Sequence, residues 1–596
     1  MNTELQPVLV LDPVVDVEES YKASEVVYKS GVNKSIYKYT ADSYSDQNWI
    51  WNNITPPSLN CVVKRDLRIA YSILVANVWT TATGQPVQFN AVNTTGASVS
   101  EGTNTSFGCV PRACPIQSSA SSVELRLNGS ATSTSINDYA CIYPHVLSDY
   151  AKSLIASEMP LQKDNSALYN NPKNYSIDNG FTDARSPFVP YGTNPQQPSR
   201  GSFVWKQITA PTVAGDYSYA VYQLDLVEQL FISPMVWAEL MDKSAGLSNL
   251  NNLILNIRFA DLNRMLSAIL TTTNSLQITT QKNISVAVNG TNVSVAGGGE
   301  SPTLLVEYIT QDPILAAKQP QTLVYDYSLV QPFISPCGTW TGTLSSNPSF
   351  TAQSLRLASI PSKLYIFARP SKSALVGALA QTTPDTFLRI KSVSINFNNR
   401  INLFATYTEA DLYSMSVKNG LQDSFNDWKY QNGSICIVDI ARDIGLESDE
   451  TDGQANKYST LQITATIDSS PLAYAGVDPF PAIGLSYDFY ILVEQPGKAF
   501  INASECQYIL TGPSASEVLK LTSEMEPRVD HTEIEGKGVG GSVFGKVGKL
   551  LKSGVNMFKN VNPEHVARGV EMAQGALKSL GLGVAGGAMK KHSRVY

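Results

Sequence analysis

Histidine, the usual general base of enzymes and a frequent metal ligand, is scarce in this chain. The 596 residues include four, and three of them, His531, His565 and His592, lie in or beside the C-terminal tail. His145 is therefore alone in the body of the chain, which argues against a His-dependent hydrolase and a His-ligated metal site. We expect His145 to be a capping or surface residue of the first helix.

Paired carboxylates could support glycoside hydrolysis, which needs two acids on either side of the scissile bond. Asp439 with Asp443 and Asp449 with Glu450 are the nearest candidates. We interpret them as acids of strand ends, loops and turns, although their spacing leaves a glycosidase open. The sequence predicts no catalytic residue, no cofactor and no metal site.

A glycine-rich segment, Gly540 to Val547, nearly matches a phosphate-binding loop. It has Val547 where a Ser or Thr should meet magnesium, and no strand pattern precedes it. We therefore reject a nucleotide site there.

The seven cysteines are scattered, odd in number and free of CxxC pairs. Cys109 and Cys114 are close enough in sequence to bridge, but two buried free thiols are the preferred interpretation.

The elements that would position any site are mainly strands. Charged residues make up only 16% of the chain, against about 25% in ordinary globular proteins. In Lys363–Ala368, bulky residues alternate on both faces, which predicts a strand covered on both sides in the middle of a sandwich. Asn289-Gly290 predicts that Gln277–Val295 forms a hairpin.

Two longer helices are expected among these strands, besides a short one that starts at Ser233-Pro234. Pro144–Met159 has an apolar stripe that starts after a proline. The second begins with a capping box of Thr408 and Asp411, buries Leu412, Met415 and Val417, and stops at Lys418-Asn419-Gly420.

Similar short segments recur in the two halves of the chain. SVELRLN at 122–128 and SVSINFN at 392–398 each come shortly before a helix, and LVEQ occurs at 226–229 and at 492–495. The similar offsets suggest two β-sandwiches of about eight strands, each with a helix inserted at the same place. Eight antiparallel strands in two sheets form a jelly roll.

The C-terminal tail, residues 514–596, is rich in Gly and Ala and has a different charge. From Lys537 onward it carries a net charge of +8, which leaves −15 on the preceding residues. Its apolar residues predict a basic amphipathic helix. Three interpretations stay open: a solvated terminus, an assembly segment that packs on a partner, and a contact with nucleic acid or membrane. The apolar face consists of Phe544, Val547, Leu551, Val555 and Phe558.

Six segments carry a resemblance to a known family. The chain is similar to the double jelly-roll major capsid proteins of polinton-like viruses, adintoviruses and virophages. The segments are LFISPMVW at 230–237, LNNLILNIRF at 250–259, IPSKLYIFARP at 360–370, LYSMSVKNG at 412–420, GSICIVDIARDIGL at 433–446 and YDFYILVEQPGKAFI at 487–501.

The resemblance implies an all-β fold of two consecutive eight-stranded antiparallel jelly rolls with a few short inserted helices and a Gly-rich basic tail. We expect an N-terminal arm over residues 1–50, a first jelly roll over 51–315, a second over 316–513 and the tail over 514–596. Three copies would form a pseudo-hexameric capsomer, and capsomers would tile an icosahedral shell around a DNA genome.

The same resemblance implies the partners and the location. The chain would associate with itself as a homotrimer and then as a lattice, with penton and minor capsid proteins, and would act on no small-molecule substrate. It would be assembled inside the host cell and reside in the virion. The tail would contact the genome or inner capsid components.

In relatives of this family a cysteine protease trims capsid proteins after Gly-Gly or Gly-x sites that follow a hydrophobic residue. Val584-Ala-Gly-Gly587 roughly fits this pattern, and Gly538-Val-Gly-Gly541 departs from it at the first position. Gly541 and Gly587 are therefore candidate positions for proteolytic maturation by a partner protease.

Two other functions remain open from the sequence. A trimeric glycan-binding spike or adhesin would also be all-β and rich in Asn, Ser and Thr, but would form discrete trimers without shells. A β-sandwich glycosidase would require a cleft with paired acids.

Overall fold

The computed structural model describes residues 34–510, with the longer gaps at 101–108, 162–204, 236–245, 311–321, 340–348, 445–458 and 469–485. Shorter gaps fall within 59–100, 149–158, 269–272 and 353–399. The chain divides into two compact units, Met1–Arg528 and Val529–Tyr596. The second unit and the whole of the tail predicted over 514–596 lie outside the described residues.

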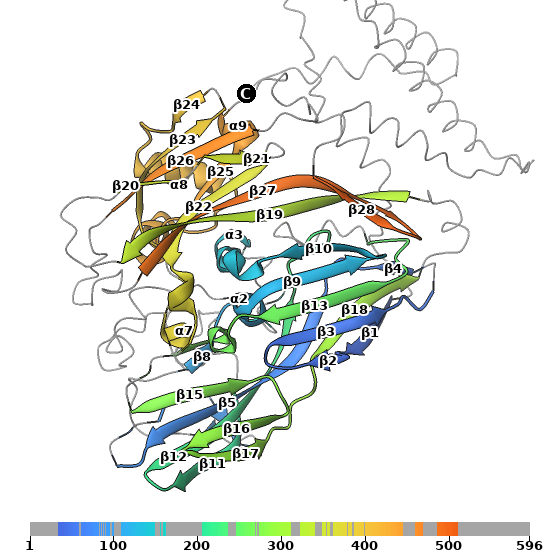
Figure 1. Cartoon of the computed structure of the whole chain (residues 1–596), viewed down its shortest axis with the longest axis vertical. Helices are drawn as coiled ribbons and strands as arrows, with labels where there is room; N and C mark the ends of the chain where they lie inside the picture. Colours follow the sequence, from blue (N-terminus) through green and yellow to red (C-terminus); the bar gives the residue numbers. More distant parts are fainter. Residues whose placement is uncertain are drawn as a thin grey trace, which may run out of the picture. The chain divides into compact units, whose positions relative to one another are not determined.

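The first sandwich consists of two sheets (Figure 1). One runs in the order β1-β18-β5-β12 and continues through β11, β6 and β7, and the other runs β10-β9-β13-β3-β2. The eight strands shared with a simple jelly roll are β1 (Lys34–Thr40), β3 (Asn48–Ile54), β5 (Arg68–Thr80), β9 (Ala120–Leu127), β10 (Ser130–Thr134), β12 (Tyr217–Gln229), β13 (Leu253–Phe259) and β18 (Thr303–Thr310).

Additional strands and helical turns are attached to this sandwich. The additional strands are β2 (Ser43–Tyr44), β4 (Cys61–Val63), β6 (Ala91–Val92), β7 (Ser98–Val99), β8 (Cys109–Pro111), β11 (Trp205–Ala214), β14 (Leu266–Ala268), β15 (Asn274–Thr279), β16 (Asn283–Val288) and β17 (Thr291–Ala296). The helical turns are α2 (Pro115–Ser119), η1 (Ile136–Asp138), η2 (Ala140–Ile142), α3 (Tyr143–Val146) and η6 (Leu262–Met265).

The second sandwich has sheets of order β19-β27-β22-β25 and β20-β26-β23-β24. Its strands are β19 (Thr322–Thr339), β20 (Ser349–Thr351), β21 (Leu355–Leu357), β22 (Lys363–Pro370), β23 (Ile390–Phe397), β24 (Arg400–Leu403), β25 (Cys436–Asp439), β26 (Ser459–Ile467), β27 (Ser486–Asn502) and β28 (Cys506–Ile509). Its helices are η7 (Lys372–Leu375), α7 (Leu379–Thr382), α8 (Glu409–Lys418), η8 (Asp427–Gln431) and α9 (Ile440–Ile444).

Both sandwiches have the same topology. If the eight main strands of each are counted in chain order, with β20 as the second strand of the second sandwich, the sheets run 1-8-3-6 and 2-7-4-5 in both halves. Two four-stranded antiparallel sheets connected in this way form a jelly roll. The predicted double jelly roll is therefore confirmed.

Strand β22 shows why the local sequence folds as it does. Its residues alternate between two faces, and those from Leu364 to Pro370 are all buried. It pairs with β27 on one side and β25 on the other, which confirms the predicted central position.

Helix α8 confirms the predicted capping box. The Thr408 side chain accepts from the Asp411 backbone N–H, the Asp411 carboxylate accepts from the Thr408 N–H, and Asn419 is the C-cap. Leu412 and Met415 are buried as expected, but Val417 is exposed. The prediction for Val417 is wrong, because the stripe of side chains through which the helix packs is narrower than predicted and excludes this residue.

The helix expected over Pro144–Met159 is interrupted rather than continuous. Ile155 is again helical, and its carbonyl accepts from the Met159 N–H at 2.9 Å, while residues 149–154 and 156–158 lie outside the described residues. Helix α3 ends at Val146, and Leu147 has extended backbone angles. The Leu147 side chain is fully buried, so core packing, rather than continuation of the helix, determines its backbone.

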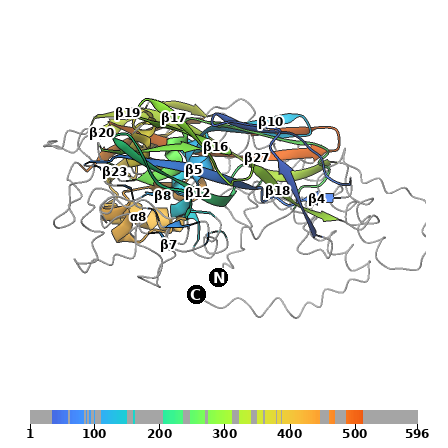
Figure 2. The same ribbon diagram turned by 90° about the horizontal axis from the view of Figure 1, so that it is seen from below.

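The predicted hairpin at Asn289-Gly290 is confirmed by β16 and β17, which pair without a register shift. It is shorter than predicted, because Gln277 to Thr279 belong to β15, which pairs with β5. Both turn residues have positive φ, as a tight two-residue hairpin requires. Ile284, Val286 and Val288 cover a small second core on β5 and β12, and Figure 2 shows β16 beside these strands.

Of the two sequence similarities between the halves, the one between SVELRLN and SVSINFN is confirmed as a structural equivalence, and the one between the LVEQ segments is wrong. SVELRLN and SVSINFN lie on β9 and β23, each the fourth strand of its sandwich, and helical segments follow the fifth strand in both halves. LVEQ lies on β12, a sixth strand, and on β27, an eighth strand. Those tetrapeptides are not equivalent, so their similar offset is a coincidence.

A continuous set of buried apolar side chains extends through both sandwiches. Its largest fully buried members include Trp49, Trp51, Trp205 and Trp428. All seven cysteines are free and six of them are buried, as expected for Cys109 and Cys114. The domain boundaries stay a prediction. Lys34–Thr40, inside the expected arm, pairs with β18, and residues 1–33 and 311–321 lie outside the described residues.

Candidate functional site

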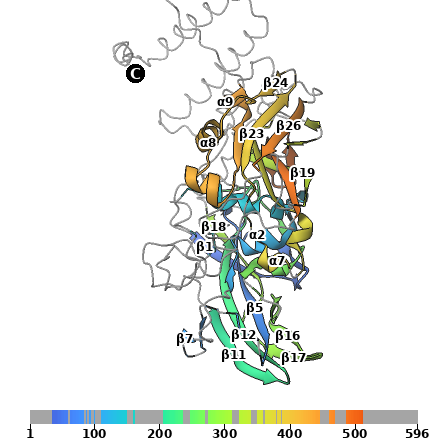
Figure 3. The same cartoon turned by 90° about the vertical axis from the view of Figure 1, so that its left-hand side faces the viewer.

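Charged side chains of the two sandwiches meet at their mutual contact, which we call the sandwich junction. Helix α7 extends from the second sandwich and lies against η6 and β14 of the first. Figures 1 and 3 show α7 reaching the first sandwich near α2. The ionisable residues of the junction are Arg112, Asp138, His145 and Arg264 from the first sandwich and Arg369, Lys372, Asp385 and Asp423 from the second.

Two buried arginines hold α7. Arg112 donates through Nη2 to the carbonyls of Ala380 and Thr383 at 3.2 and 3.1 Å. Arg264 donates to the same two carbonyls at 3.2 and 2.6 Å. These carbonyls lie at the C-terminal end of α7, where cations are favoured.

Asp385 supplies the negative charge for both arginines. Its Oδ2 lies 3.3 Å from Nη1 of Arg112, and its Oδ1 pairs with Nη2 of Arg264. The Arg112 side chain is fully buried, so loss of this carboxylate would leave charge without compensation in a low-dielectric site.

A second cluster ties the end of β22 to the turns after β10. Arg369 donates to the Asn137 carbonyl and to Sγ of Cys141, both at 3.0 Å. Its guanidinium carbon lies 5.1 Å from the centre of the Tyr490 ring. Lys372 Nζ lies 2.9 Å from the buried Asp138 carboxylate.

His145 differs from its prediction as a capping or surface residue. It is 2% exposed, and its Nδ1 lies 2.6 Å from Oδ2 of Asp423 in the second sandwich. The Gln422 backbone N–H donates to the His145 carbonyl at 2.8 Å. The residue is therefore part of the junction, and its partner lies 278 positions away.

Polar contacts continue along the edge of the junction. Thr132 on β10 and Tyr327 on β19 share a hydrogen bond of 2.6 Å between their hydroxyl groups. Asn128, in the turn before β10, donates to the Asn249 carbonyl at 2.8 Å and to the Asn502 carbonyl at 2.6 Å. The fifth strand of the first sandwich thus faces the first strand of the second.

Glu228 is a fully buried carboxyl group within the first sandwich. It accepts from the Ile116 and Gln117 N–H groups, from the Gln117 side chain and from the Tyr71 hydroxyl, at 2.8 to 3.1 Å. Burial raises the pKa of Glu228 to about 7, and these four donors oppose the rise. Ionisation of Glu228 therefore affects folding near neutral pH.

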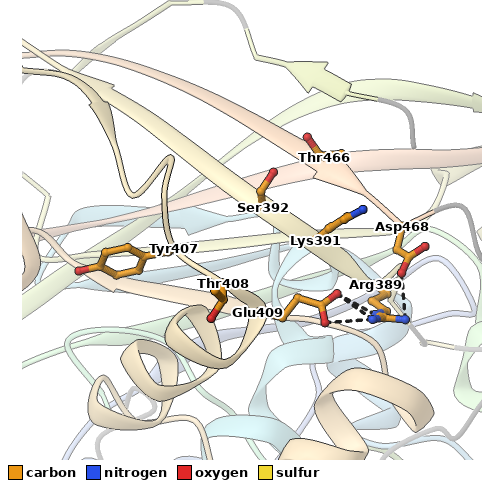
Figure 4. Close-up of a pocket in the computed structure, with 8 residues that line it drawn as sticks. All are labelled: Arg389, Lys391, Ser392, Tyr407, Thr408, Glu409, Thr466 and Asp468. Atoms are coloured by element: carbon orange, nitrogen blue, oxygen red, sulfur yellow. Dashed lines mark hydrogen bonds and ion pairs between the residues drawn. The ribbon is translucent and has the colours of Figure 1, made fainter. Parts of the chain in front are cut away.

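A surface pocket of about 610 Å³ lies between β23, β26 and the start of α8 (Figure 4). Arg389 pairs with Glu409 on one side and with Asp468 on the other, with nitrogen–oxygen distances of 2.8 to 3.0 Å. Lys429 also reaches Glu409. Burial raises the pKa of Glu409, but donation by Arg389 and Lys429 lowers it below its usual value.

The chemistry available in this pocket is limited. Its other lining residues are Lys391, Ser392, Tyr407, Thr408 and Thr466. The lining contains no His or Cys that could act as base or nucleophile. The ion pairs instead tie β23 and β26 to α8, which is a stabilising role. Asp439 and Asp443 lie elsewhere, where Asp443 accepts from the Asp439 backbone N–H. Asp449 and Glu450 lie outside the described residues.

Across the part of the chain that the structure describes, no group of three or more His, Cys, Asp or Glu side chains could hold a metal ion. In the same residues, no helix is long and apolar enough to cross a membrane. Gly541 and Gly587, and the predicted tail helix with Phe544, Val547, Leu551, Val555 and Phe558, lie outside the described residues.

Sequence reasoning missed the sandwich junction. The partners of Arg112 and Arg264 lie on α7, more than 100 positions further along the chain. No local periodicity marks such residues, because their burial depends on a contact between distant segments.

Two family descriptions match the chain. "Sputnik virophage major capsid protein 1st domain" matches residues 3–308, which is more than half of the chain. "Major capsid protein V20 C-terminal domain" matches residues 339–478. The chain is also 24% identical over 573 residues to the putative capsid protein V20 of Sputnik virophage, covering 90% of this chain and 86% of that protein.

Solved structures give the same fold. The Sputnik virophage structure at 3.5 Å from cryo-electron microscopy contains a chain with a TM-score of 0.63 and 19% identity, which covers 88% of this chain and 94% of that one. The crystal structure of the mavirus major capsid protein has a TM-score of 0.56 and 14% identity, with coverage of 87% and 98%.

Proposed function

Because the chain belongs to the family of Sputnik-type virophage major capsid proteins, we propose that it forms pseudo-hexameric homotrimers that tile an icosahedral shell around a DNA genome. The chain is a major capsid protein of virophage type and a component of the virion. What we propose beyond this role is that three copies form a capsomer, that capsomers form the lattice of the shell, and that the shell encloses a DNA genome.

The observation that carries the proposal is the repeat of one topology within a single chain. Two jelly rolls with the same strand order can occupy successive places in a ring, so three chains supply six similar units. The sandwich junction supports this mechanism, because the ion pairs of Asp385 and the hydrogen bond between His145 and Asp423 hold the two units of one chain together.

The role we propose is structural rather than enzymatic. The relatives are capsid proteins by name. A glycan-binding spike is the second candidate from the sequence, and no contact in the described residues favours it.

The partners proposed for the chain are further copies of itself, together with penton and minor capsid proteins. The basic tail, with its apolar face from Phe544 to Phe558, would assist assembly by contacting inner capsid components or the genome. A protease would then remove tail segments after Gly541 or Gly587.

The mass of the purified chain in solution tests the proposal. Mass photometry of the full-length protein should give three times the 64.6 kDa chain mass. A chain truncated after Glu535 should give the trimer as well, but should form fewer shells on concentration. A monomer at all concentrations in both samples would contradict the proposed capsomer.

A further inference from the structure

Asparagine followed by glycine is a sequence at which a protein chain readily modifies itself. The backbone nitrogen of the glycine can attack the side-chain amide carbon of the asparagine, because glycine has no Cβ to block the approach. The chain contains five such pairs, of which Asn179-Gly180 lies outside the described residues. The other four are Asn128-Gly129, Asn289-Gly290, Asn419-Gly420 and Asn432-Gly433.

Hydrogen bonds on both ends of its amide hold the Asn128 side chain. The amide nitrogen donates to the carbonyls of Asn249 and Asn502 at 2.8 and 2.6 Å. The amide oxygen accepts from the backbone N–H groups of Asn251 and Asn252 at 2.8 and 3.2 Å. The side chain must rotate towards the following glycine before that nitrogen can attack it, and these contacts oppose the rotation.

Burial restrains two further pairs. Asn419 is buried, and its side-chain nitrogen donates to the Ile437 carbonyl at 2.8 Å. Asn432 is also buried, and Gly433 packs against the Phe387 backbone so closely that a Cβ at this glycine would lie 1.9 Å from the Phe387 carbonyl oxygen. Neither pair can rearrange without a change in the surrounding core.

Asn289 has none of these restraints. It is exposed at the tip of the hairpin formed by β16 and β17, and no hydrogen bond or ion pair within the described residues holds its side chain. A Cβ built on Gly290 would meet no atom within 4 Å, so the backbone of the turn is open on that side. Figures 1 and 3 show this hairpin beside β11 and β12 at one end of the first sandwich.

We propose that Asn289 is a site of spontaneous deamidation, at which the folded protein converts a neutral side chain into a carboxylate. The Gly290 nitrogen bonds to Cγ of Asn289 while the Cγ–Nδ2 bond breaks, and its proton leaves with the amide nitrogen as ammonia. A five-membered succinimide ring results. Water then adds to one of the two ring carbonyls and opens the ring to aspartate or isoaspartate, so the reaction requires neither an enzyme nor an oxidant.

The turn sets the rate of this reaction. Asn289 and Gly290 have φ angles of 48° and 73°, the left-handed backbone of a two-residue hairpin turn. Asn289 must leave this conformation to form the ring, so the ring closes when the tip of the hairpin opens. A two-stranded sheet opens locally at a lower free energy than a strand in the centre of a sandwich.

The isoaspartate product changes the hairpin that carries it. It adds one carbon to the main chain, so the turn no longer matches the pairing of Val288 with Thr291. Val288 belongs to the small second core, with Leu74 on β5 and Val221 on β12. Conversion therefore loosens the cover of this core and adds a negative charge to the surface of each modified copy.

Peptide mapping by mass spectrometry, after storage of the full-length protein in mildly alkaline buffer, tests the inference. In the folded chain, Asn289 should convert to aspartate and isoaspartate while Asn128, Asn419 and Asn432 stay intact. The same protein unfolded in guanidinium chloride is the matched control. All four pairs are unrestrained there and should convert at similar rates.

Asn289→Gly is the matched variant, because Gly-Gly also suits a two-residue hairpin turn. The thermal unfolding midpoint of the natural protein should fall during storage, and that of the variant should stay constant. The inference is overturned if Asn289 stays intact in the folded chain, or if one of the three restrained pairs converts at least as fast. Neither outcome bears on the proposed capsid role.

Discussion

Asp385 is the residue on which two buried guanidinium groups of the first sandwich depend. Asp385→Asn removes the carboxylate but keeps the size of the side chain, so Arg112 and Arg264 lose their negative partner. We expect a loss of about 3–5 kcal/mol in the free energy of unfolding. Urea denaturation followed by tryptophan fluorescence measures it.

The surface pair Glu124 and Arg126 provides the comparison for Asp385. Glu124→Gln should cost less than about 1 kcal/mol, because exposed ion pairs contribute little. Equal effects of the two substitutions would show that the junction charges do not stabilise the chain.

Glu228 makes stability depend on pH. The folded protein holds its proton more tightly than the unfolded chain, since the pKa rises from 4.5 to about 7. The stability that the protonated Glu228 contributes is thus fully present below about pH 4.5 and is lost as the pH rises through about 7. The Glu228→Gln variant stays neutral and should not show this dependence. Its free energy of unfolding, relative to that of the natural protein, should therefore rise by up to about 3 kcal/mol when the pH is raised from 5 to 8.

Thermal unfolding midpoints at both pH values measure this difference, with Glu505→Gln as the control for loss of an exposed carboxyl group. A variant that follows the natural protein at both pH values would contradict the role of Glu228.

At the scale of single residues, the sequence supported few conclusions. It correctly placed Leu412 and Met415, whose environment follows from helical spacing. It misplaced His145 and gave no sign of the role of Asp385, because the partners of both are determined by the contact between two sandwiches.

Among the elements, helix α8 depends on its cap. Thr408→Ala removes the acceptor for the Asp411 N–H and half of the capping box, so stability should fall by about 1 kcal/mol. Ser414→Ala, on the exposed face of the same helix, is the control and should leave stability unchanged or raise it slightly. Urea midpoints measure both, and a smaller loss for Thr408→Ala than for Ser414→Ala would contradict the role of the cap.

Elements governed by local chemistry were the ones that the sequence predicted well. The capping box, the Asn289-Gly290 turn and the alternation in β22 each contain their own signal. The continuous helix predicted over Pro144–Met159 is interrupted at Leu147, because burial of this side chain overrides the helical pattern.

For the whole molecule, proteolytic maturation is a separate prediction. Mass spectrometry of purified particles should find C-termini at Gly541 or Gly587, since the tail is proposed to act during assembly and then to be removed. Protein purified without the viral protease is the control and should retain Tyr596. Particles with an intact Tyr596 would rule out trimming.

The double jelly roll was predictable because the repeat of strand patterns and the six family segments extend over much of the chain. The strand order that makes the two halves equivalent was not predictable from the sequence. It depends on pairings between strands that are far apart in the chain, such as β1 with β18. The equivalence of β10 with β24 follows from that order and not from any sequence match between these two strands.

Cryo-electron microscopy of the purified full-length chain tests the central claim most directly. Our account predicts particles with six similar β-sandwiches around one axis, built from three chains. Particles with a single pair of sandwiches, or copies joined without a six-unit ring, would contradict it.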